Sequence, residues 1–297
     1  MYLSFLFFLS SIFFLGALIP FHRMMWASLL LGGFLSFLAL WVFHRLILRF
    51  GVSKFLLCIE AFFSAFLGAL TLYCLSEFFS FCVLQELPMW FFPSAFLICC
   101  GYAAVKDVYV LERFSKLCGP AVIFLLVLAL GSGISKIRIS FNNGFFSWQD
   151  FIYPSDTTFF VSVFFFAVLF FIEGSILITL LNTRLKNLTP FKSTMKGFFL
   201  SILFLSCTYL ITVLVLGPYV FELLTYPIYY PPGLTGDAEY LERIEIVFLA
   251  VFLISEFVKI SLCLLMIKET FLSFLRKKKR KPLCHTSKPQ IASSQNQ

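Results

Sequence analysis

A carboxylate, a glycine and a serine stand together in the middle of a long apolar stretch: Glu173, Gly174 and Ser175 lie within the run 159–181. Such a run is long and apolar enough to form a helix that crosses a bilayer, where a charged side chain usually faces a functional interior rather than lipid. The glycine weakens the helix at the same level and can expose backbone groups to a ligand. The triplet therefore predicts a solute-binding site inside a membrane.

The composition supports a membrane location for the whole chain. Of 297 residues, 60% are hydrophobic and only 13% are charged, and 43 are phenylalanine. A soluble fold of this length could not bury so much apolar surface. The apolar runs are too dense for the alternation of an outer-membrane barrel. We predict an all-α polytopic membrane protein, in contact with the lipid bilayer and without a nucleic-acid partner despite its net charge of +8.

Eight apolar stretches approach the roughly 20 residues that a membrane-crossing helix needs. They are Tyr2–Pro20, Trp26–His44, Phe55–Leu84, Phe91–Val105, Gly119–Ser135, Phe159–Leu181, Gly197–Gly217 and Glu245–Ile267. We predict a transmembrane domain over 1–267, formed by spans one to five and six to eight, and a basic, disordered tail over 268–297. The first stretch lacks the charged start and the cleavage site of a signal peptide, so we interpret it as a retained span.

Lysine and arginine predict the orientation of these spans. The connections near 44–54, 106–118 and 182–196, together with the tail from Lys268, hold 18 of the 23 basic residues. Basic residues concentrate on the cytoplasmic side of a membrane. We therefore expect a multi-pass protein of the bacterial cytoplasmic membrane with both termini in the cytoplasm. The run 276–281 is a basic anchor in this interpretation, and specific recognition of anionic lipid is the alternative.

Other charged residues also fall inside predicted spans. Glu256 and Lys259 are three residues apart, so they share a helix face and can form an ion pair. A role in coupling stays open for both, and Lys259 could instead contact Glu173 or a substrate carboxylate. Glu60 and Glu77 lie near the two ends of the third span, and we expect them to reach the interface.

The sequence contains no recognisable catalytic, metal-binding or nucleotide-binding motif. Most of the nine cysteines lie inside spans and form no CxxC pair, and the three histidines are far apart. HExxH, GxSxG and Walker motifs are missing as well. We therefore expect no enzymatic activity, no metal site and no cofactor.

Several segments, in order and spacing, resemble the spore germination permease family of the amino acid–polyamine–organocation superfamily. They are Trp26–Gly33, Tyr102–Asp107 followed by Glu112-Arg113, Phe170–Gly174, Tyr226-Pro227 and Tyr240–Glu245. The resemblance implies two inverted five-helix repeats with broken first and sixth helices. This chain has only eight predicted spans and ends in a basic tail where the ninth would begin, so the fold would be shortened at its C-terminal end.

The resemblance also implies a site between the broken helices. Gly16 and Ala17 would lie on one side, and Glu173, Gly174 and Ser175 on the other. Unwound backbone there would offer N–H groups to a carboxylate and C=O groups to an ammonium, which suits an amino acid or a similar small solute. Three functions stay open. The chain could transport the solute, sense it as a germinant-receptor subunit with membrane or lipoprotein partners, or act as a structural subunit without a ligand.

Overall fold

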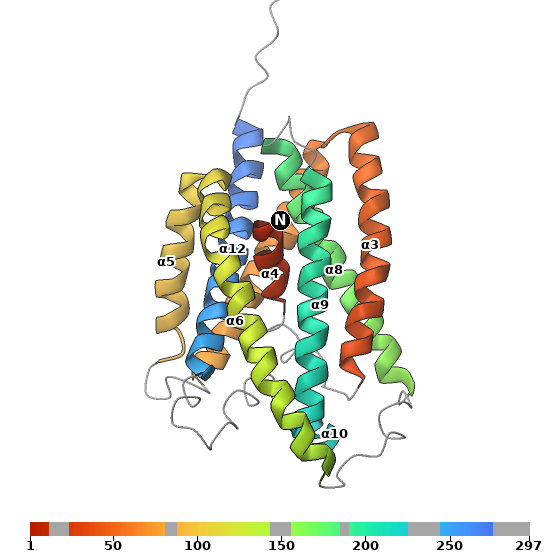
Figure 1. The fold of residues 1–297 in the computed structure, drawn as a ribbon. Helices are drawn as coiled ribbons and strands as arrows, with labels where there is room; N and C mark the ends of the chain where they lie inside the picture. The colour runs from red at the N-terminus through yellow and green to blue at the C-terminus, as the bar shows by residue number, and fades with distance from the viewer. Residues whose placement is uncertain (12–23, 81–87, 143–155, 185–189, 225–243, 276–297) are drawn as a thin grey trace, which may run out of the picture.

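The computed structural model describes residues 1–11, 24–80, 88–142, 156–184, 190–224 and 244–275, and in these ranges every regular element is a helix (Figure 1). The helices are α1 (Tyr2–Leu9), α3 (Met25–Phe50), α4 (Lys54–Phe78), α5 (Phe91–Lys106), α6 (Val108–Asn142), α8 (Asp156–Arg184), α9 (Pro190–Leu216), α10 (Pro218–Leu223) and α12 (Ile244–Leu275). They form a single bundle. The prediction of an all-α polytopic membrane protein is confirmed.

Helices long and apolar enough to cross a membrane account for six of the eight predicted spans. The fourth predicted span corresponds to α5, an apolar helix of 16 residues. The first corresponds to α1, and the rest of that stretch lies outside the described residues. The predicted spans thus each contain a helix, because long apolar runs in a bilayer must satisfy their backbone groups within the segment.

The connection expected at 106–118 is wrong. Asp107 alone separates α5 from α6, and its φ of 115° turns the chain sharply between the two helices. The next charged residues lie on α6, where Glu112 and Lys116 form an ion pair of 2.7 Å while Leu111 is buried. Charges spaced four apart leave one face of a helix apolar, so this segment stays helical instead of forming a loop.

The eighth helix extends beyond the predicted domain boundary at 267/268. Helix α12 continues to Leu275, and the Thr270 hydroxyl donates a hydrogen bond of 3.1 Å to the carbonyl of Leu57 on α4. The Lys268 amine donates to two carbonyls at the end of α5. The start of the predicted tail is therefore part of the bundle. The basic run 276–281 and the residues after it lie outside the described residues.

Helix α1 is surrounded by the other helices. Its residues from Leu3 to Leu9 are all buried, and it packs on α9, α12 and α6. Gly197 on α9 allows the closest approach, because a Cβ there would overlap the Ser4 hydroxyl. The helix ends at Leu9, inside the bundle. A helix end at this depth places the end of a backbone dipole, and its last carbonyls, among the neighbouring helices.

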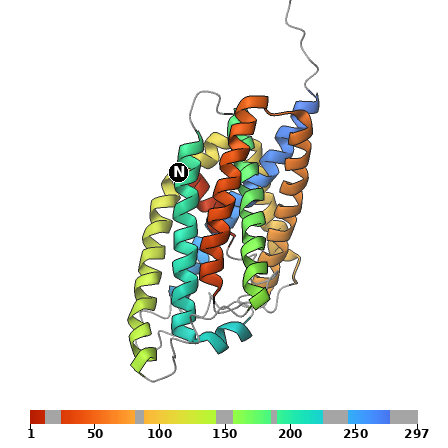
Figure 2. The ribbon, with the colours of Figure 1, turned by 90° about the vertical axis from the view of Figure 1, so that its right-hand side faces the viewer.

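The other helices pair across the bundle. Helix α3 packs along α8 and α9, and α4 packs along α12, as the side view also shows (Figure 2). The last turns of α3, α5, α8 and α12 and the first turns of α4, α6 and α9 lie at one end of the bundle (Figures 1 and 2). The amine of Met1 reaches this end too, where it donates to Ser193. The helices therefore alternate in direction as the predicted topology requires.

Candidate functional site

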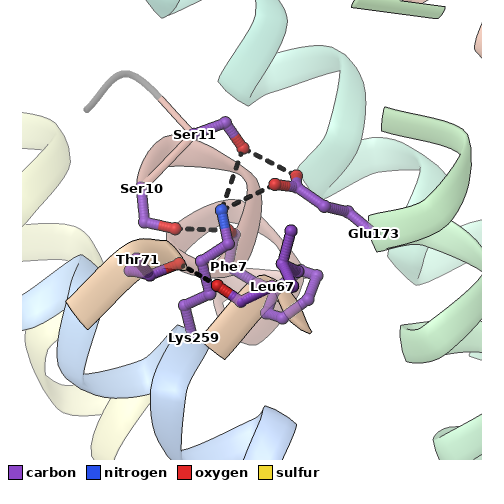
Figure 3. Close-up of polar contacts among 7 residues, drawn as sticks. All are labelled: Phe7, Ser10, Ser11, Leu67, Thr71, Glu173 and Lys259. Carbon is purple, nitrogen blue, oxygen red and sulfur yellow. Dashed lines mark hydrogen bonds and ion pairs between the residues drawn. The ribbon is translucent and has the colours of Figure 1, made fainter. Parts of the chain in front are cut away.

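A buried ion pair joins two helices at the end of α1. The Lys259 amine on α12 lies 2.6 Å from the Oε1 atom of Glu173 on α8, and both side chains have 0% exposure. The Ser11 hydroxyl, just after α1, donates a hydrogen bond of 2.6 Å to Oε2 of the same carboxylate. Lys259 also donates to the Ser11 oxygen at 3.4 Å. These three side chains point toward one another in Figure 3, and we call them the central triad.

Local sequence explains why α1 ends next to the triad. Two consecutive serines, Ser10 and Ser11, follow its last apolar residue. Their backbone N–H groups donate to the carbonyls of Leu6 and Phe8, and the Ser10 hydroxyl donates to the carbonyl of Phe7 at 2.8 Å. Serine side chains compete for backbone groups in this way and favour helix ends. The termination places Ser11 within reach of both charged partners.

The lysine amine lies among groups that attract a cation. Its amine lies 6.0 Å from the centre of the Phe7 ring, a cation–π distance. It also lies beside the C-terminal end of α1, where the helix dipole is negative. A buried ammonium needs such partners, because removing one member of a buried ion pair costs about 3–5 kcal/mol.

Glu256 is one turn before Lys259 on α12, yet it does not take part in the ion pair. Its side chain has 0% exposure, and both carboxylate oxygens lack a hydrogen-bond partner among the described residues. Lys259 and Glu173 are both within electrostatic reach of it. The ion pair that the sequence predicts between Glu256 and Lys259 is therefore not formed here. Lys259 contacts Glu173 instead, an alternative that the sequence left open, and the Ser11 hydroxyl donates to the same carboxylate.

Ser175 faces a different neighbour. Its hydroxyl lies 3.1 Å from the carboxylate of Glu60 on α4 and 2.9 Å from the carbonyl of Ile172, and either oxygen can accept its proton. Glu60 is 3% exposed, so the expectation that it reaches the interface is wrong. Two residues along a helix point about 200° apart, which explains why Glu173 and Ser175 contact different helices.

Gly174 does not interrupt its helix. Helix α8 is continuous from Asp156 to Arg184, so the break expected at Glu173-Gly174-Ser175 is wrong for this structure. A Cβ at position 174 would overlap the side chain of Leu40 on α3. Gly174 therefore serves close helix packing, a use of glycine that is common in membranes. The other expected broken segment, with Gly16 and Ala17, lies outside the described residues.

Sequence reasoning missed Ser11. The signal that could have found it is the Ser10-Ser11 pair, the point where polar side chains interrupt the first apolar run. It also missed the burial of Glu60. No group of three side chains suited to hold a metal occurs within the described ranges. The chemistry available at the triad is thus that of one carboxylate, one hydroxyl and one ammonium.

Comparison with known proteins adds a family match. A family model described as spore germination protein matches residues 1–289, which is most of the chain and includes every residue of the triad. Neither the curated proteins nor the solved structures gave a match.

Proposed function

Because this chain belongs to the spore germination protein family, we propose that it binds an amino acid or a similar small solute at the central triad. The family and the multi-span helical bundle make it a polytopic membrane protein of permease type. The observation that carries the proposal is the fully buried triad of Ser11, Glu173 and Lys259 at an internal helix end. Ionisable residues inside membrane helices are expensive, and they mark binding sites and ion pathways.

The chemistry of the triad matches the two poles of an amino acid. The Glu173 carboxylate can accept hydrogen bonds from an ammonium group, and the Ser11 hydroxyl can donate to a carboxylate. The expectation that the backbone of Gly16 and Ala17 contributes further polar groups concerns residues outside the described ranges. Ser175 does not contact the triad. We propose that its hydroxyl holds the buried carboxyl group of Glu60 next to the site.

The helix contacts support an inverted repeat. Helix α1, the first of one half, packs on α9, the second of the other half. Helix α3, the second of the first half, packs on α8, the first of the other half. The third helices, α4 and α12, pack on each other. Reciprocal contacts of this kind are expected for two halves related by a pseudo-two-fold axis, with the substrate at their interface.

We further propose a location in the cytoplasmic membrane with both termini in the cytoplasm. The support is that Met1 and the last turn of α12 lie at one end of the bundle, together with the helix ends next to the basic connections. Positive charge concentrates on the cytoplasmic side.

Transport and sensing both fit this site. The family description as a spore germination protein favours the second candidate, a receptor-type subunit that binds the solute and signals to partner subunits without net transport. In that case the triad would bind the same ligand, but rocking of the two halves would end in a signal rather than in release on the other side.

The test compares the wild type with Glu173→Gln in proteoliposomes, using a pool of labelled amino acids. We expect saturable binding to the wild type and its loss in the variant, because the amide cannot balance an ammonium. Glu112→Gln is the matched control, since its carboxylate also pairs with a lysine but at the exposed surface. Uptake along with binding indicates a transporter, and binding without uptake indicates a receptor subunit. Absence of binding to the wild type would refute the proposal and favour a structural subunit.

A further inference from the structure

The interior next to the triad holds more negative than positive groups. In the described part of the chain, the buried charged residues are Glu60, Glu173, Glu256 and Lys259. Glu60 is apart from the others, with Ser175 as its partner. Around Lys259, two carboxyl groups therefore face one amine. Glu173 takes the amine at 2.6 Å, and Glu256 is fully buried and has no hydrogen-bond partner among the residues that the structure describes. An unpaired buried carboxyl group is unfavourable and needs a reason to be retained.

The two carboxyl groups are arranged as alternative partners of one lysine. Glu256 precedes Lys259 by three residues on α12, so both side chains project from the same face of one helix. Lysine carries its charge on a flexible four-carbon stem and can change partner without any backbone movement. Glu256 lies within electrostatic reach of both members of the ion pair. The geometry therefore offers Lys259 a second resting position on its own helix.

We propose that Glu256 receives the Lys259 amine when the ammonium group of the solute takes its place on Glu173. The inference rests on the proposed function and specifies how that site selects its ligand. Without ligand, two carboxyl groups share one amine. With ligand, each has its own cation, Glu173 the ammonium of the solute and Glu256 the lysine. The ammonium of the solute gives each of the two buried carboxyl groups a cation of its own, while the Ser11 hydroxyl can donate to the solute carboxylate, so the site selects solutes that carry an ammonium group.

The exchange has a mechanical consequence. The pair of Glu173 with Lys259 ties α8 to α12, whereas a pair of Glu256 with Lys259 lies within α12. Arrival of the ligand thus releases a tie between α8 and α12. Ligand binding can shift a conformational equilibrium only through such a difference in contacts between two states.

The first experiment measures binding of the labelled amino-acid pool to Glu256→Gln in proteoliposomes. Without its second partner, Lys259 stays on Glu173 and competes with the solute. We expect binding to weaken by between about 5- and 150-fold, the usual range of coupling between two sites. The glutamine variant should unfold at the wild-type temperature or above, because the carboxyl group it replaces has no partner to lose. Wild-type affinity in a folded Glu256→Gln variant would overturn the exchange.

A second variant makes the test specific to competition by the lysine. In Glu256→Gln/Lys259→Met the competing amine is gone, so we expect binding to recover toward the wild-type level. If the double variant loses as much binding affinity as Glu256→Gln alone, the exchange is overturned, because Glu256 would then affect binding independently of Lys259. Glu112→Gln/Lys116→Met, the same pair of changes at the surface, is the matched control for folding and insertion.

The wild type provides a test that does not depend on the folding of any variant. Unlabelled alkylamines should displace the bound amino-acid pool, and alkyl carboxylates of the same chain length should displace it much more weakly. Equal displacement by both series would overturn the selection of an ammonium group. If the wild type binds no amino acid at all, the proposed function itself fails. If it binds but Glu256→Gln binds equally well, only the exchange fails.

Discussion

Two glutamate–lysine pairs of nearly equal length belong to different regions of this molecule. Glu112 and Lys116 are 2.7 Å apart on the surface of α6, with side chains 33% and 64% exposed. Glu173 and Lys259 are 2.6 Å apart with no exposure at all. The surface pair is local, i to i+4 on one helix, and is worth only about 0.3–0.5 kcal/mol. The buried pair joins two helices, and breaking it costs about 3–5 kcal/mol. Equal distance therefore says little about energetic or functional weight.

The largest effect is expected where the buried pair is broken. Lys259→Met removes the only buried ammonium in the described part of the chain and leaves two buried carboxyl groups within electrostatic reach of each other. We expect the free energy of unfolding to fall by about 3–5 kcal/mol. Reversible unfolding in detergent, followed by circular dichroism, measures the change. If the free energy of unfolding falls by less than it does for a typical surface substitution, the triad does not stabilise the fold.

A smaller effect is expected from the packing that holds α8 against α3. Gly174→Ala places a methyl group against Leu40, and overpacking of this kind costs about 1–3 kcal/mol. In a Leu40→Ala background the methyl group has room, so Gly174→Ala should cost less there than it does in the wild type. Gly101→Ala is the control, because a Cβ there would meet open space and no other described segment. Equal stability of Gly174→Ala and Gly101→Ala in detergent unfolding would contradict the close contact.

The smallest effect is expected at the surface pair. Glu112→Gln should change the free energy of unfolding by about 0.5 kcal/mol or less, and added salt should reduce the difference further. The same unfolding measurement at low and high salt checks this. If Glu112→Gln lowers the free energy of unfolding as much as Lys259→Met does, the surface pair and the buried pair do not differ in their contribution to stability.

The sequence was informative about the helices and poor at their ends. Long apolar runs predict spans because a bilayer imposes length and composition on each segment by itself. The connection expected at 106–118 became helix because charged residues also occupy the outer face of a helix, and a count of charges cannot tell a face from a loop. Gly174 suggested a helix break because the presence of a glycine, like a count of charges, does not show what surrounds it. Whether a glycine opens a helix or admits a neighbour depends on Leu40, which is far away in sequence.

For the candidate site, too, some features follow from the sequence and others from the packing of the helices. The sequence alone indicates that Glu173, Glu256 and Lys259 lie within membrane-spanning segments, because the apolar runs that contain them are long enough to cross a bilayer. It also put Glu256 and Lys259 on one face of one helix. The packing of the helices selects the carboxylate that holds the lysine. That choice depends on how closely α8 and the end of α1 approach α12, and on the Ser11 hydrogen bond that fixes Glu173, and such contacts between distant segments are set by packing rather than by local spacing.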